Sequence, residues 1–108
     1  MTSITVIKED DRVLAFTCNG HAGYADMSED IVCAAISILV LNTINSIEVL
    51  TDTVPITELD EETGYIHCSF EDDITDEAAL LIDAMILGLS QIQEQYGTKY
   101  IDVKIKEV

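Results

Sequence analysis

The stretch DIVCAAISILVLNTINSIEVL, residues 30–50, decides the fold, because it is too long for a buried strand and contains no glycine or proline. Strands in globular proteins usually have roughly 3–10 residues, whereas a longer run without breakers is typical of a helix. We therefore predict a helix from about Glu29 to Leu50. Its first half is apolar nearly all round and its second half is amphipathic, so the end nearest Cys33 is expected to pack more deeply.

Segments of alternating apolar and polar residues lie on both sides of this helix. Residues 3–8 (SITVIK) and 13–18 (VLAFTC) flank the turn sequence EDDR, which predicts a first hairpin. Residues 56–60 (ITELD) and 65–70 (YIHCSF) flank EETG in the same way and predict a second hairpin. The helix therefore connects two pairs of strands.

A second helix and a last strand complete the chain. Thr75 or Asp73 can cap the helix, acidic residues follow in its first turn, and Gly97 ends it. Residues 99–106 (KYIDVKIK) then alternate as a strand. The order ββαββαβ predicts a single α+β domain over residues 1–108, with a largely antiparallel sheet and two helices.

The charge of the chain excludes several classes of partner. Twenty-one acidic residues against five basic ones give a formal net charge of −16, which repels a phosphate backbone or an anionic lipid surface. We therefore expect no direct nucleic-acid partner and no membrane partner, and the chain shows neither a basic leader nor about 18 unbroken apolar residues. Nine of the acids lie between Glu58 and Glu77 without a Lys or Arg among them. This run predicts either capture of a basic peptide or a solvated face.

The cysteines indicate a reducing compartment. The chain has three cysteines, an odd number, at Cys18, Cys33 and Cys68. They are widely spaced and include no CxxC pair, which favours free thiols in the cytoplasm over a disulfide framework. We predict no zinc site and no cofactor. Cys18 and Cys68 lie on predicted strands and are expected in the core, and His67 is expected on the sheet face opposite Cys68, because adjacent strand residues point to opposite sides.

His21 and Cys33 are the candidate base and nucleophile. A cysteine nucleophile reacts as the thiolate, which a helix N-terminus and a nearby histidinium both favour. With Asp30 as the helix cap, Cys33 would occupy the third helical position, whereas with Asp26 as the cap it would lie two turns in; Ser28 is a further candidate. The eleven intervening residues easily span a hydrogen-bond length. The competing interpretation is a buried core cysteine and an unrelated loop histidine.

Read as one block, GHAGYADMSEDIVCAAIS, residues 20–37, resembles the signature of the ribosomal-processing cysteine proteases, the Prp family. The resemblance extends to the chain length, the leading hairpin and the twelve-residue step from His to Cys. It implies a bacterial cytoplasmic endopeptidase, a homodimer, that removes a short N-terminal extension from large-subunit ribosomal protein twenty-seven during ribosome maturation. Ser28 stands where family members commonly place a glycine.

The same resemblance assigns roles to individual residues. Cys33 matches the nucleophile and His21 its base, while Gly20, Asp30 and Ser37 match other motif positions. Asp30 either orients His21 or caps the helix. Ser37, one turn after Cys33, either hydrogen-bonds near the site or bonds back to the Cys33 carbonyl.

Two other functions remain open from the sequence. A non-catalytic acidic module would bind a basic ribosomal protein without cleaving it, and a redox sensor would need Cys18 or Cys68 as the resolving thiol for Cys33. The reactivity of Cys33 toward iodoacetamide separates the enzyme from the module, because only the enzyme requires a reactive thiolate. In either case the net charge of −16 attracts a basic protein, and an extended substrate segment can add a strand to an exposed sheet edge.

Overall fold

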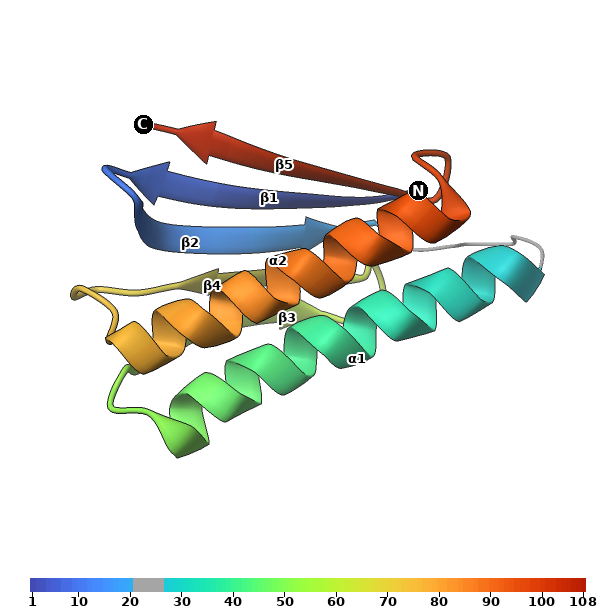
Figure 1. Cartoon of the computed structure of the whole chain (residues 1–108). Coiled ribbons are helices and arrows are strands. Elements are labelled where there is room, and N and C mark those ends of the chain that lie inside the picture. Colours follow the sequence, from blue (N-terminus) through green and yellow to red (C-terminus); the bar gives the residue numbers. More distant parts are fainter. Residues whose placement is uncertain (21–26) are drawn as a thin grey trace.

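The computed structural model describes the backbone of residues 1–20 and 27–108 and the side chains of residues 1–20 and 31–108. The predicted order ββαββαβ is confirmed in these residues, which form an α+β domain (Figure 1). In chain order the elements are β1 (Thr2–Glu9), β2 (Arg12–Asn19), α1 (Met27–Leu50), β3 (Ile56–Asp60), β4 (Tyr65–Ser69), α2 (Asp76–Tyr96) and β5 (Ile101–Glu107).

The strands form one five-stranded sheet in the order β3-β4-β2-β1-β5. The pairs β1·β2, β2·β4 and β3·β4 are antiparallel, whereas β1 and β5 are parallel. The sheet is therefore mostly antiparallel, as predicted, but mixed. The parallel pair arises because α2 carries the chain from β4 back across the sheet to β5, and parallel pairing requires such a crossover.

Both predicted hairpins are present. Asp10 and Asp11 have φ values of 50° and 67° and form the two-residue turn between β1 and β2, a left-handed conformation that aspartate tolerates better than most residues. In the turn between β3 and β4, Asp60 Oδ1 accepts a hydrogen bond from the Glu62 N–H at 3.0 Å, and Gly64 has a φ of 71°. Short polar turns of this kind fix the register of each hairpin.

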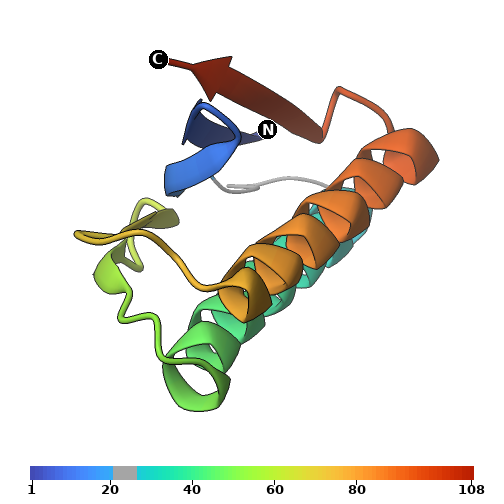
Figure 2. The same cartoon turned by 60° about the vertical axis from the view of Figure 1, so that its left-hand side comes forward.

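Both helices cover the same face of the sheet, and the described residues place no helix on the other face (Figure 2). The buried apolar side chains of the sheet and of the helices meet in one core. It contains Ile4, Val6, Phe16, Cys18, Ile66, Cys68, Val32, Ile36, Val40, Ile44, Ile47, Ala78, Ile82, Met85 and Leu89. The helices approach closely at Gly88, where a Cβ atom would lie 2.8 Å from Leu39 Cδ2.

Helix α1 buries one stripe of side chains spaced three or four residues apart, the spacing of a single helix face. The stripe consists of Val32, Ile36, Val40, Ile44 and Ile47. The prediction that the end nearest Cys33 packs more deeply is not confirmed, because apolar side chains are exposed at both ends: Ile31 and Ile38 are 52% and 72% exposed, and Val49 and Leu50 are 77% and 72% exposed. The sheet and α2 cover one side of α1, and no described element covers the opposite side.

One segment among the described helices, Ile31–Leu50 of α1, is long and apolar enough to cross a membrane by length and composition, with a mean hydropathy of 1.8. The core helix of a folded domain passes the same test, so the composition is weak evidence. In this chain 33% of the segment is buried within the fold. The buried part is the stripe that packs against the sheet and α2.

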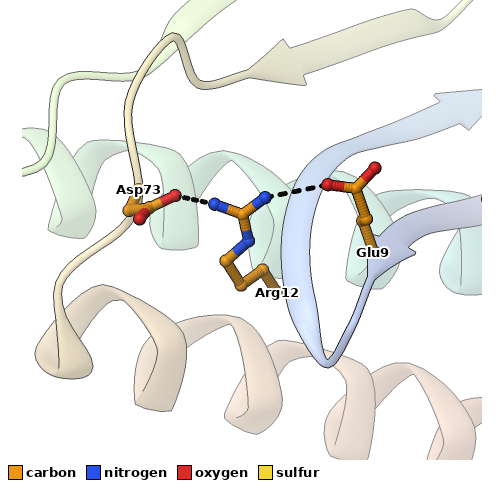
Figure 3. A network of polar contacts seen from close by, with 3 residues as sticks. All are labelled: Glu9, Arg12 and Asp73. Atoms are coloured by element: carbon orange, nitrogen blue, oxygen red, sulfur yellow. Dashed lines mark hydrogen bonds and ion pairs between the residues drawn. The ribbon is translucent and has the colours of Figure 1, made fainter.

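The two candidate caps of α2 have different roles. Thr75 is the N-cap, and its hydroxyl accepts a hydrogen bond from the Ala78 N–H at 3.2 Å. Asp73 instead binds Arg12, which also donates to Glu9 at 2.9 Å, so that one guanidinium joins the β1–β2 turn to the segment before α2 (Figure 3). The two carboxylates raise the pKa of Arg12. Gly97 ends α2, as predicted, with a φ of 101°.

Candidate active site

The candidate site begins where β2 ends. We call the end of the sheet at which β2 finishes the site end, and the end at the Asp10–Asp11 turn the far end. Gly20 follows β2 with a φ of 98°. A Cβ atom at this position would lie 2.6 Å from the backbone oxygen of Met1. Both the positive φ and the close approach require glycine. Gly20 thus sets the direction of the chain immediately before His21, which itself lies outside the described residues.

Helix α1 begins at Met27, earlier than the predicted start near Glu29. Asp30 is therefore the fourth residue of the helix and does not cap it, which corrects the interpretation of Asp30 as the cap. The helix includes residues 27–29 because they contain no glycine or proline, and acidic residues are favourable in a first turn. Cys33 is the seventh helical residue, about two turns in, where the influence of the helix dipole has mostly decayed.

The three cysteines differ in burial. Cys18 and Cys68 are 3% and 0% exposed, as predicted, and burial raises the pKa of each thiol from 9.0 to about 11. The pKa of Cys18 is also raised by the charge of Cys33, so α1 places Cys33 within electrostatic range of the site end of β2. Cys33 itself is only half-buried, unlike the two core thiols. The interpretation of Cys33 as a buried core cysteine is therefore wrong.

Ser37 lies one turn after Cys33 on the same side of α1 and is also half-buried. Within the described part of the chain its hydroxyl makes no hydrogen bond, so the predicted back-bond to the Cys33 carbonyl does not form. Thr43 shows what such a bond looks like, since its hydroxyl donates to the Leu39 carbonyl at 2.7 Å. The Ser37 hydroxyl is consequently available to another group beside Cys33.

His67 is separated from Cys33 by the sheet. Its Nδ1 lies 2.9 Å from the Thr17 hydroxyl, and its ring is stacked with that of Tyr65 at a centroid distance of 6.4 Å. Cys68, the next residue, points into the core, so His67 lies on the face without helices, as predicted. Of the two histidines in the chain, only His21 belongs to the segment that leads from the site end to α1.

An apolar depression on α1, which the sequence interpretation missed, adjoins Cys33. It is shallow and open to solvent, and it is lined by Ala34, Ala35, Ile38, Leu39 and Asn42. The signal in the sequence was the pair of small residues directly after the cysteine, because alanine leaves room above the helix surface. No cluster of three or more His, Cys, Asp or Glu residues suited to a metal ion occurs in the described part of the chain.

Comparison with known proteins covers nearly the whole chain. The family model of the cysteine protease Prp matches residues 1–102. The ribosomal processing cysteine protease Prp of Bacillus subtilis (strain 168) is 32% identical over 101 residues, which are 89% of this chain and 90% of that protein. The protein of the same name from Staphylococcus aureus (strain Mu50) is 31% identical over 91 residues, or 84% and 86% of the two chains.

Solved structures share the fold at similar identity. SMU.848 from Streptococcus mutans has a TM-score of 0.89 at 31% identity, over 100% of this chain and 96% of that one. The essential ribosomal processing protease Prp from S. aureus has a TM-score of 0.90 at 29% identity in its complex with a substrate peptide, and 0.87 at 30% in its complex with a covalently linked product peptide; each comparison covers 98% of this chain and 100% of that one. The chain therefore belongs to the Prp family of cysteine proteases.

Proposed function

We propose that this protease removes the N-terminal extension of large-subunit ribosomal protein twenty-seven during bacterial ribosome maturation, in the cytoplasm. The observation that carries the proposal is the similarity along the whole chain to proteins named ribosomal processing cysteine proteases. A relative with the same fold binds a substrate peptide. The net charge of −16 supports a substrate rich in Lys and Arg, as ribosomal proteins are, because opposite charge accelerates encounter.

Cys33 is the nucleophile of the proposed mechanism and His21 the base. His21 takes the thiol proton, the Cys33 sulfur attacks the carbonyl carbon of the scissile bond, and a C–S bond forms. The leaving amine receives the proton from His21 as the C–N bond breaks. Water then attacks the thioester, releasing the acid product and restoring the thiol. The covalently linked product peptide in the S. aureus relative supports a covalent route.

The start of α1 at Met27 limits where the oxyanion donors lie. The Cys33 N–H is two turns into the helix and donates to the carbonyl four residues earlier, as in any α-helix. Unpaired N–H groups remain only in the first turn, about 6 Å or more along the axis from Cys33. The donors that stabilise the tetrahedral intermediate therefore come from outside the helical turns around Cys33. Asp30 and Ser37 act in support, Asp30 by orienting His21 and Ser37 by hydrogen-bonding beside the nucleophile.

A homodimer is part of the proposal, and the outward faces of the helices support it. Ile38, Leu80 and Leu87 are 72%, 69% and 61% exposed, on the side of α1 and α2 away from the core. Leu80 and Leu87, seven residues apart, lie on one face of α2, and exposed apolar side chains gathered on one face are typical of protein interfaces. A dimer that buries them removes this apolar surface from water.

The direct test is incubation of the protein with ribosomal protein twenty-seven of its own host, read by mass spectrometry. We expect one N-terminal truncation by the parent and none by Cys33→Ser. The non-catalytic acidic module, which family membership already disfavours, predicts binding without cleavage by either protein. Cleavage at many positions, or none with a substrate that carries an extension, would exclude the proposed activity.

A further inference from the structure

The far end of the sheet contains a cavity of about 160 Å³ that no part of the proposed mechanism uses. Its lining includes three apolar side chains and three carboxylates: Val54, Ile56, Phe70, Asp52, Glu71 and Asp72. Val54 and Ile56 are 74% and 46% exposed, so this apolar surface faces solvent. Cavities of about 150 Å³ accept a molecule the size of benzene, and this one has room for a single long side chain.

The charge around the cavity is not neutralised from within the fold. Asp73, a further lining residue, is bound by Arg12 (Figure 3), whereas Asp52, Glu71 and Asp72 form no ion pair with any described residue. A cavity lined by both apolar side chains and carboxylates is complementary to lysine or arginine, whose stem is apolar and whose head is cationic.

The wall of the cavity is held in place by hydrogen bonds. The buried Thr53 hydroxyl donates to Thr75 Oγ1 at 3.1 Å and accepts from the Thr75 N–H at 2.9 Å. Thr75 in turn caps α2. The segment between α1 and β3 is thereby fixed to the start of α2, so the cavity is formed before any ligand arrives and binding requires little ordering of the protein.

Strand β3 continues from this cavity as an open edge of the sheet. Ile56 is both a lining residue and the first residue of β3, whose five residues are all exposed and whose only described partner is β4. Glu58 and Asp60 make this edge acidic, whereas Lys104 and Lys106 protect the opposite edge, β5, as lysines often do. An acidic edge disfavours pairing with its own copy and favours a basic strand.

We propose that the open edge of β3 and the cavity together form an exosite, which binds an extended basic segment of the substrate as an added strand and takes one lysine or arginine side chain into the cavity. The inference rests on the proposed function for its substrate. The register connects the two sites: Leu59 lies opposite Ile66, and Ile66 opposite Cys18 near the end of β2. A strand bound along β3 therefore runs from the cavity to the site end.

Binding is tested apart from cleavage, by NMR titration of the ¹⁵N-labelled protein. The probes are an acetylated and amidated Val-Lys-Val-Lys-Val-Lys peptide and its Val-Glu counterpart. We expect shifts of the Ile56–Asp60 and Phe70 amides with the lysine peptide only. The exosite would be overturned by shifts confined to β5 or to the α1 depression, or by equal binding of both peptides. It would also be overturned if the β3 amides shift with protein concentration in the absence of peptide.

A matched pair of variants tests the cavity. Glu71→Gln/Asp72→Asn should weaken the lysine peptide by roughly two- to tenfold, whereas Asp10→Asn/Glu107→Gln, with the same charge change at the β1–β2 turn and the end of β5, should not. In cleavage assays Glu71→Gln/Asp72→Asn should lower kcat/KM for the intact ribosomal protein. The same variant should leave kcat/KM unchanged for a short peptide that spans the scissile bond. Equal effects of the two variants would overturn the exosite. Binding at β3 without any cleavage would overturn the proposed function and leave the exosite standing.

Discussion

The two ends of the sheet are both acidic, but the chain is held differently at each. At the far end, side chains form the connections: Arg12 joins Glu9 to Asp73, and Thr53 joins the α1–β3 segment to Thr75. At the site end, the backbone itself is constrained, because Gly20 passes too close to Met1 for any other residue. The far end is thus a surface fixed by side-chain contacts. At the site end, the backbone at Gly20 fixes the direction in which the chain leaves β2.

The same comparison divides the acidic run between Glu58 and Glu77. Asp60 and Glu61 lie at the site end, because Asp60 pairs with Tyr65 next to the turn that faces the end of β2. Glu71 and Asp72 lie at the far end, beside the cavity. Acids of one acidic region of the sequence are therefore separated by the length of the sheet, and the proposed exosite assigns them to different parts of a substrate.

The largest effect is expected from removing the nucleophile. Cys33→Ala and Cys33→Ser should lower kcat by at least roughly a thousandfold, because no other group at this position forms the thioester. The fold should persist, since Cys33 is half-buried and a small side chain fits in its place. Peptide cleavage and far-UV circular dichroism measure the two effects.

Alkylation supplies the control for this prediction. With the pKa of Cys18 and Cys68 at about 11, both thiols are protonated and buried at neutral pH and should react slowly with iodoacetamide. The parent should therefore be labelled at Cys33 first. Residual cleavage by Cys33→Ser near the parent rate, or faster labelling of Cys18, would contradict the assignment.

The constraint at the site end predicts a difference between two glycines with nearly the same φ. Gly20→Ala adds a Cβ atom 2.6 Å from the Met1 oxygen and should cost about 2–4 kcal/mol of unfolding free energy, with a loss of cleavage. Gly97→Ala meets no atom within 4 Å and should cost about 1 kcal/mol, from φ strain alone. Urea unfolding measures both. Equal costs would show that the close approach to Met1 does not constrain the chain.

Most of the fold followed from the sequence because its elements have local signals. Alternation marked the strands, and Thr75 and Gly97 marked the bounds of α2. The parallel pairing of β5 did not follow, since it depends on which edge α2 delivers the chain to. The start of α1 was missed because Asp26, Ser28 and Asp30 are all chemically suited to a cap. The cavity was missed because Val54, Phe70 and Glu71 come together only in the folded chain.

The buried thiols of Cys18 and Cys68 predict a loss of stability at alkaline pH. The folded-state pKa of Cys18 and Cys68 is raised from 9.0 to about 11, so the unfolded chain ionises first. Their contribution is complete below pH 9 and is lost as the pH rises through about 11, on the order of 2 kcal/mol for each thiol. Urea unfolding under reducing conditions should show a shallower alkaline decline for Cys18→Ala and Cys68→Ala than for the parent. Parallel declines would refute the prediction.

The smallest effect separates the acids of the two ends by their influence on a short peptide substrate. Strand β2 has eight residues, so the ends lie roughly 25 Å apart, more than two Debye lengths at 0.1 M salt. Asp60→Asn/Glu61→Gln should therefore lower kcat/KM for a basic peptide by roughly two- to threefold at about 0.1 M salt, with kcat nearly unchanged, because screening acts on encounter rather than on bound chemistry. Asparagine retains the oxygen that accepts from the Glu62 N–H, so the turn survives.

The far-end pair Glu71→Gln/Asp72→Asn carries the same charge change and is the matched control for that variant. With the short peptide it should follow the parent in kcat/KM and in salt response, because its carboxylates are screened from the scissile bond. With the intact ribosomal protein both pairs should lower kcat/KM, since the longer substrate reaches the cavity as well as the site end. If both pairs instead act equally on the short peptide, only the total charge matters. The division of the acidic run between the two ends would then have no consequence for catalysis.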